Sequence, residues 1–374
     1  MQKIFISLII IGFSFQKKII SLSLTESYGT YDIYLKLNEK YDNQQLELDM
    51  ASDFLWVDYP KYYFEDEPLG DTRNFSIGNQ TYPFQESISD LTFQKGTIKL
   101  LQFPLFQFKG KSISNFDTFP LSHSYRNESL SVIHRFNNDG LIESKAFGFY
   151  YNLTNQSANL YLGGLPDELI SNYPYLKSCP VAKNSSTYNP YWGCEFTEVV
   201  MGNIRYKNNH FSYFQSNVEY IYAPLEFQMF LVDSYFKPFI QNKTCIFHSE
   251  SSSMFFDCDC HQIKEQPPII FKFKGFDVSF SIEEMSLKHG NFCYFNIEKN
   301  IEDENSWKFG ILFLQKFVSL FDIETDTITF YSLTSLEPHN KKIIEFIYIF
   351  TSIGMFISVL NYIIVITKNK ISLW

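Results

Sequence analysis

The feature that most constrains this chain is a repeated pattern of short apolar runs between residues 28 and 340. Apolar and polar residues alternate within a run, as in residues 31–37, and clusters of Asn, Gly, Asp and Ser separate the runs about every eight to twelve residues. Helical spacing is rare and is best developed in residues 130–138 and 225–240. The pattern predicts an all-β fold, and 374 residues with 45% hydrophobic content are enough for two domains or one large one.

Hydrophobic segments at both ends predict a membrane protein of the secretory pathway. Residues 4–15 have the length of a signal-peptide core, and small residues further on place the signal peptide at residues 1–23. Residues 346–366 are uncharged, largely apolar and flanked by lysines, which predicts a transmembrane helix and a short cytoplasmic tail at 367–374. We therefore expect a single-pass type I protein of the cell surface or of an endolysosomal membrane. A lipid-anchor signal is the alternative.

The composition between these ends is that of an ectodomain. A net charge of -10 argues against a nucleic-acid partner, because binding phosphates requires basic surface. Six cysteines, an even count, predict disulfides whose connectivity stays open. The cluster of Cys258, Cys260 and His261 lacks a second ligand pair, so we expect no metal site and no cofactor. Seven Asn-x-Ser/Thr triplets predict N-glycosylation, at Asn74, Asn79, Asn127, Asn152, Asn155, Asn184 and Asn242.

One apolar strand, residues 46–57, delivers a carboxylate into a tight turn. This segment resembles the first active-site segment of pepsin-like aspartic proteases, in which an apolar strand leads into Asp-Thr-Gly-Ser. Asp49 matches the catalytic Asp and Ser52 matches the Ser, whereas Met50 replaces Thr and Ala51 replaces Gly. The turn thus keeps its acid, and we expect it to lack the hydroxyl that ties the two active-site turns together.

The resemblance extends over most of the chain, because further segments occur in the family's order. They are residues 31–37, 146–150, 160–164, 191–203, 267–275 and 307–322. The resemblance implies a bilobal pepsin-like fold, with β-barrel-like lobes at residues 24–170 and 171–335 around a cleft. It also implies that either Cys258 or Cys260 pairs with Cys293.

The second active-site turn of the family precedes a segment that resembles residues 220–224. In the family two aspartates share a proton and hold the attacking water. Counting back from that segment places Gln215 on the second Asp, Ser216 on the hydroxyl residue and Asn217 on the Gly. Because an amide does not titrate, the general acid–base cycle should be lost. The candidate substrate-binding residues are Ser52, Ser216 and Asn217.

Other positions of the family's site are also altered. The flap segment, residues 88–96, contains no Tyr, and residues 118–120 replace an apolar-apolar-Gly sequence that the second lobe keeps at Gly310. A nearby carboxylate such as Glu219 or Asp233 could in principle replace the missing acid, although Glu219 should point elsewhere if the turn is kept.

Three hypotheses follow. The first is a membrane-anchored pseudoprotease that binds a peptide or protein in the cleft without cutting it. The second is an active aspartic endopeptidase with an atypical dyad, and the third is a surface glycoprotein whose cleft is filled.

Overall fold

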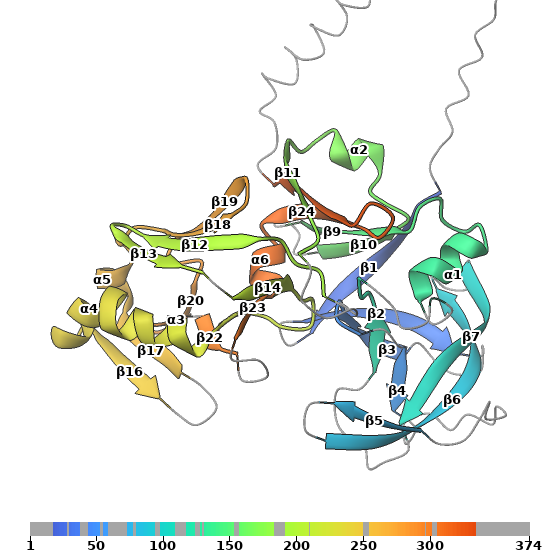
Figure 1. Cartoon of the computed structure of the whole chain (residues 1–374), viewed down its shortest axis with the longest axis horizontal. Coiled ribbons are helices and arrows are strands. Elements are labelled where there is room, and N and C mark those ends of the chain that lie inside the picture. The colour runs from blue at the N-terminus through green and yellow to red at the C-terminus, as the bar shows by residue number, and fades with distance from the viewer. Residues whose placement is uncertain are drawn as a thin grey trace, which may run out of the picture.

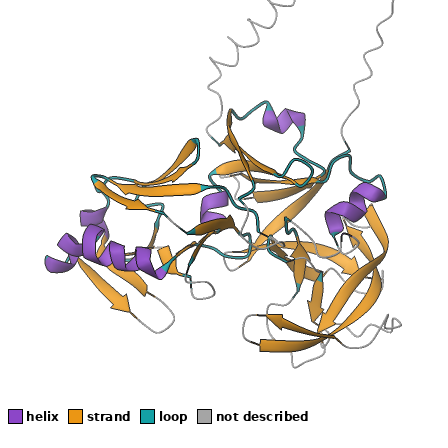
Figure 2. Cartoon of the chain, in the orientation of Figure 1, coloured by secondary structure: helices purple, strands orange, loops and turns teal. Residues whose placement is uncertain are grey.

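The chain folds mainly into β-sheet, which confirms the all-β prediction (Figure 2). The computed structural model describes residues 18–27, 30–37, 44–52, 55–58, 73–77, 80–93, 98–108, 117–123, 128, 131–152, 157–182, 191–208, 210–249, 254–295, 297–300 and 305–333.

The N-terminal half supplies most of a 13-stranded sheet with the order β11-β25-β24-β9-β10-β1-β2-β3-β8-β4-β7-β6-β5. Its strands from this half are β1 (Ile20–Ser27), β2 (Thr30–Leu37), β3 (Gln44–Asp49), β4 (Trp56–Asp58), β5 (Arg73–Ile77), β6 (Gln80–Phe93), β7 (Ile98–Phe108), β8 (Thr118–Pro120), β9 (Ala146–Asn152) and β10 (Ser157–Leu162).

One end of this sheet joins the two halves of the chain. Strand β24 (Phe317–Asp322) pairs with β9, while β25 (Thr327–Ser332) pairs with β24 and with β11 (Tyr175–Pro180). Figure 1 shows β9, β10 and β24 lying between the strands of the N-terminal half and those of the C-terminal half. Residues 317–332 of the predicted second lobe therefore complete a sheet that begins in the first.

Strand β1 bears on the predicted end of the signal peptide. Ile20 pairs with Leu162, and both Ile20 and Leu22 are buried in the core. Cleavage after residue 23 would divide this strand. The boundary at residue 23 stays a prediction, and a site before Lys18 would leave β1 whole.

The C-terminal half forms three four-stranded sheets, with the orders β13-β12-β18-β19, β14-β23-β15-β22 and β16-β17-β21-β20. The strands are β12 (Phe196–Met201), β13 (Ile204–Lys207), β14 (Phe211–Phe214), β15 (Ile221–Ala223), β16 (Cys245–Ser249), β17 (Met254–Asp259), β18 (Ile269–Phe273), β19 (Phe276–Phe280), β20 (Ser286–His289), β21 (Phe292–Phe295), β22 (Ile297–Lys299) and β23 (Ser306–Phe309).

The helices are short, and both stretches with helical spacing are helical. The hydroxyl of Ser131 accepts a hydrogen bond from the His134 N–H and caps the first helix. The stretch 225–240 is divided before Pro238, which has no N–H to continue a helix. The helices are α1 (Val132–Asn138), α2 (Asp167–Ile170), α3 (Leu225–Phe230), η3 (Leu231–Tyr235), α4 (Lys237–Gln241), α5 (Cys260–Ile263) and α6 (Ile311–Leu314).

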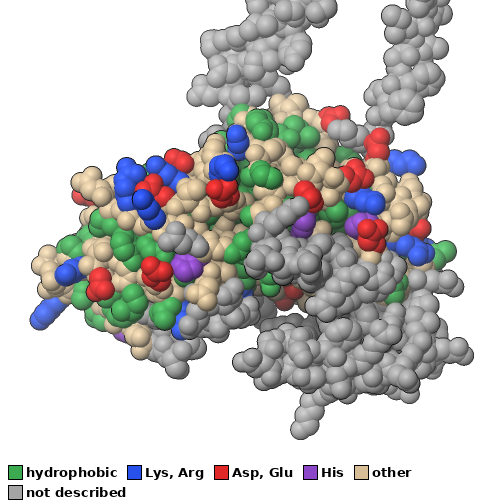
Figure 3. All heavy atoms as spheres, in the orientation of Figure 1, with side chains coloured by type: hydrophobic (Ala, Val, Ile, Leu, Met, Phe, Trp, Pro, Cys, Tyr) green, Lys and Arg blue, Asp and Glu red, His purple; other side chains and the backbone are tan. Residues whose placement is uncertain are grey.

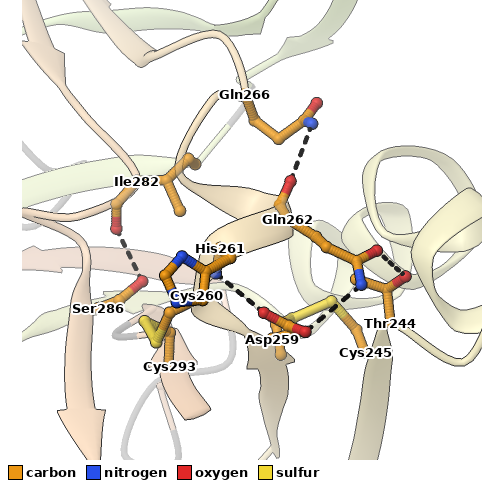
Figure 4. The surroundings of a disulfide bond; sticks show 11 residues. Thr244, Cys245, Asp259, Cys260, His261, Gln262, Gln266, Ile282, Ser286 and Cys293 are labelled. Carbon is orange, nitrogen blue, oxygen red and sulfur yellow. Dashed lines mark hydrogen bonds between the residues drawn. A yellow bond between two sulfur atoms is a disulfide. The ribbon is translucent and has the colours of Figure 1, made fainter. Parts of the chain in front are cut away.

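Three disulfides settle the connectivity that the sequence left open. They are Cys179–Cys194, Cys245–Cys258 and Cys260–Cys293. The cysteines beside His261 therefore belong to two different disulfides, and Figure 4 shows Cys260 with Cys293 near His261, in the first turn of α5 that the Asp259 carboxylate caps. The pairing implied by the resemblance is Cys260 with Cys293.

The two predicted hydrophobic ends fall largely outside the described residues. These are the signal-peptide core at 4–15, the transmembrane segment at 346–366 and the tail at 367–374. Within the described part of the chain, no helix has both the length and the hydropathy needed to cross a membrane.

Candidate functional site

Asp49 lies at the end of β3, in the loop that leads to β4. Strand β8 lies between β3 and β4, parallel to β3, with Pro120 beside Asp49. The Leu121 N–H donates to the Asp49 carbonyl at 2.9 Å, which ties β8 to the loop. The Ala51 N–H donates to Asp49 Oδ1 at 2.8 Å, so the turn itself orients the carboxylate.

The C-terminal half repeats this construction around Gln215. Strand β23 lies between β14 and β15 and runs parallel to β14. The Gln215 N–H donates to the Phe309 carbonyl at 3.0 Å, and the Gly310 N–H donates to the Tyr220 carbonyl at 3.0 Å. A Cβ at Gly310 would collide with the carbonyl oxygens of Tyr220 and Val218, so only glycine fits.

The two loops meet at the junction of the halves. The Gln215 side-chain Nε2 lies 3.5 Å from Asp49 Oδ1, and Gln215 is only 8% exposed. The Ser216 hydroxyl donates to the Leu48 carbonyl at 2.7 Å and is fully buried. The fold therefore brings together a carboxylate and an amide, and a serine hydroxyl ties one loop to the other.

The remaining residues of the predicted site are partly or fully buried next to the two loops. Ser52 is half-buried, and its carbonyl accepts a hydrogen bond from the Ser122 N–H at 3.3 Å. Asn217 follows Ser216, and its buried Oδ1 has no hydrogen-bond partner among the described atoms. Met50, at the position of the family's Thr, is fully buried in the hydrophobic core. Met50 therefore offers no hydroxyl at the position from which Ser216 ties the loops in the other half.

The structure adds two carboxylates that the sequence prediction missed. Glu47 precedes Asp49 by two residues on β3, and Asp32 lies opposite Glu47 on β2. Burial, together with the charges of Asp49 and Asp32, raises the pKa of Glu47 from 4.5 to about 7. The alternation along residues 46–50, apolar at every second position, is the signal that could have found Glu47.

Neither of the two carboxylates considered as substitutes for the second Asp has a described contact with Asp49. Glu219 is hydrogen-bonded to the Tyr220 side chain, and burial together with this bond raises the pKa of Tyr220. Asp233 is exposed on η3. Gln215 is thus the group that the structure presents to Asp49 from the opposite loop.

The predicted flap lies on a hairpin of the N-terminal half. Residues 88–93 belong to β6, which pairs with β7. Residues 94–96 lie outside the described part of the chain.

A cavity of about 600 Å³ lies away from this site. It is lined by residues of β19, α6, β24 and the end of β25, and its lining includes neither Asp49 nor Gln215. On the face drawn in Figure 3, basic and acidic side chains of the described residues are interspersed.

Comparisons with known proteins agree with this fold. The family described as "Eukaryotic aspartyl protease" matches residues 118–333, more than half of the chain, and the match begins at β8, after Asp49. The solved structure of an aspartic proteinase from Irpex lacteus aligns with a TM-score of 0.67 and 12% identity over 86% of this chain and 99% of that chain. At this identity the likeness shows the fold alone. No curated protein matches the chain.

Proposed function

The chain belongs to the eukaryotic aspartyl protease family, and from this premise we propose that it is a pseudoprotease that binds a peptide or protein segment between its two loops. The proposal includes a single-pass type I anchor at residues 346–366 and a location on the cell surface or an endolysosomal membrane. The sequence pattern of both ends supports this topology. Six cysteines paired in three disulfides fit an oxidising compartment.

The observation that carries the proposal is the amide of Gln215 beside Asp49, at 3.5 Å. Two carboxylates this close would share one proton, so that one could donate while the other accepts. An amide donates a hydrogen bond and takes no part in proton transfer at ordinary pH. By analogy with the removal of one member of a catalytic unit, the loss amounts to about 10⁴ in rate or more.

The hydrogen bonds that join and close the loops around this pair are present, which supports binding over a purely structural role. Ser216 holds the loop of Asp49, and Gly310 closes the loop of Gln215. A polar residue such as Gln215, held nearly buried at the junction, is costly unless it is hydrogen-bonded there. We infer that the site has kept its shape while losing its chemistry.

The test is peptide-library cleavage by the full-length chain in detergent, at about pH 3 to 7, beside Gln215→Asp and Asp49→Ala variants. We expect no cleavage by the unaltered protein and cleavage by Gln215→Asp, which restores the second acid. Cleavage by the unaltered protein that disappears in Asp49→Ala would contradict the proposal.

Glu47 favours one alternative, an active endopeptidase with an atypical dyad. Its pKa of about 7 and its interaction with Asp49 would suit a group that carries a proton near neutral pH. In that case the unaltered protein would cleave peptides, and Glu47→Gln would abolish cleavage as completely as Asp49→Ala does.

A further inference from the structure

Three carboxylates share one face of the sheet that carries the site. Glu47 and Asp49 are two residues apart on β3, so both side chains point to the same face. Asp32 is the register partner of Glu47 on β2 and lies on that face as well. Leu46 and Leu48, which alternate with them along β3, are fully buried in the core on the other face.

The described charges that act on Glu47 are all negative. Asp32 is 4% exposed and accepts a hydrogen bond from the Gln45 amide at 2.6 Å, whereas Asp49 is oriented by its own turn. Like charges placed directly across two strands destabilise a sheet. The charged groups that shift Glu47, Asp32 on β2 and Asp49 on β3, are both acidic, and together with burial they raise its pKa to about 7. Because this arrangement of carboxylates costs stability, binding of a ligand explains its presence better than a role in holding the fold together does.

An independent observation comes from the strand on the other side of Glu47. Thr118 on β8 is the register partner of Glu47 in a parallel pair, which places the two side chains on the same face. Thr118 is 9% exposed, and its Oγ1 is buried without a hydrogen-bond partner among the described atoms. A buried hydroxyl without a partner is unusual and costs free energy. Its lone pairs are an acceptor for a donor that the ligand would bring.

We propose that this face, made of Asp32, Glu47, Asp49 and Thr118, binds the guanidinium or ammonium group of a cationic residue in the peptide ligand. The proposal rests on the proposed function, since it names the chemistry that the same site selects. A guanidinium group presents several N–H donors in a plane, which carboxylates and a hydroxyl can accept together. Within the described residues, no three acidic, His or Cys side chains are arranged to hold a metal ion.

The experiment compares matched peptides on the full-length protein in detergent. The probes are fluorescein-labelled hexapeptide pools that carry either arginine or its neutral isostere citrulline at each position in turn. Binding is measured by fluorescence anisotropy at about pH 5.5 and 8.5, on either side of the point where Glu47 loses its proton. We expect a preference for arginine at one position of about 10-fold at pH 8.5, and a smaller preference at pH 5.5.

Two variants of the protein separate the contribution of the Glu47 charge from that of the Thr118 hydroxyl. Glu47→Gln should reduce the preference for arginine to about 2-fold or less, whereas Glu168→Gln, the same change at an exposed position on α2, should leave it unchanged. Thr118→Val, which keeps all three charges, should weaken binding of the arginine peptide without reversing the preference. Thermal unfolding of each variant shows that it is folded.

Three outcomes would overturn the proposal in different ways. Arginine and citrulline peptides that bind equally well to the unaltered protein would refute the cationic site and leave the proposed peptide binding intact. If no peptide of either kind binds, the peptide-binding function fails, and the cationic site fails with it. Binding with an arginine preference that survives in Glu47→Gln would place the cation elsewhere in the molecule.

Discussion

The loop around Asp49 and the loop around Gln215 are built alike, since in each a third strand lies between the two arms, yet each keeps a different part of the family's pattern. The Asp49 loop keeps the acid, and it has Met50 and Pro120 where a hydroxyl and a glycine are expected. The Gln215 loop has an amide where the family's pattern predicts the acid, and it has Ser216 and Gly310 where a hydroxyl and a glycine are expected. The acid and the hydroxyl and glycine of the family's pattern therefore stand in different halves of the chain, so the two loops can be tested separately for charge and for closure.

The largest expected effect comes from breaking the closure of the Gln215 loop. Gly310→Ala places a methyl group against the backbone oxygens of Tyr220 and Val218, which are not free to move. Because Gly310 has φ -82°, lack of space rather than backbone conformation is what requires glycine. We expect a loss of about 3 kcal/mol in the free energy of unfolding, measured with denaturant.

Pro120→Ala is the matched change in the other loop and should cost only about 1 kcal/mol. If the two variants lose equal amounts of unfolding free energy, both loops are closed equally tightly. The proposed difference in closure between the loops would then be wrong.

The next effect in size tests the charge that the Asp49 loop has kept. The pKa of Glu47 is raised from 4.5 to about 7, so the folded state holds a proton that the unfolded state releases. The free energy of unfolding should therefore fall as the pH rises from about 4.5 to 7. For this half-buried group the fall amounts to about 2 kcal/mol after allowance for solvent screening.

Glu47→Gln removes this dependence on pH. We expect the variant to be more stable than the unaltered protein at about pH 8 and equal to it at about pH 4, as measured by denaturant unfolding at both values. A variant that is less stable at pH 8 would mean that Glu47 stabilises the loop, and the carboxylate face would then need no ligand to explain it.

A smaller effect is expected from the bond that joins the loops. Ser216→Ala leaves the Leu48 carbonyl without its donor and should cost about 1 kcal/mol. Ser212, which is also buried and donates to the Cys194 carbonyl, is the matched control within one half. Only Ser216→Ala should accelerate hydrogen exchange in the turn at residues 50–52. Equal exchange in both variants would show that the bond does not brace the Asp49 loop.

Much of this arrangement could be predicted from the sequence. Strand spacing predicted the β-sheet, and the ordered segments of the resemblance predicted the family, which the match to residues 118–333 bears out. The carboxylate face could not be predicted with the same ease, because Glu47 and Asp32 become neighbours only through the register of β2 and β3. Likewise Cys258 and Cys260 are too close in sequence for spacing to decide which of them reaches Cys293.

The smallest effect would show whether the missing hydroxyl of the Asp49 loop matters at all. Met50 occupies the position equivalent to Ser216 and is fully buried, so Met50→Thr exchanges apolar volume for a hydroxyl. If the likeness of the two loops extends to this position, the new hydroxyl will donate to the backbone of the Gln215 loop, as Ser216 does to Leu48. A hydrogen bond of about 1 kcal/mol would then offset much of the lost packing, leaving a net change within about 1 kcal/mol.

The double variant Met50→Thr with Ser216→Ala makes this test decisive, because a second tie should reduce the cost of losing the first. We expect the two changes to be non-additive by about 0.5 kcal/mol or more in denaturant unfolding. Strict additivity, with Met50→Thr alone costing about 2 kcal/mol or more, would show that the Asp49 loop has repacked around Met50. Its likeness to the Gln215 loop would then be limited to the path of the backbone.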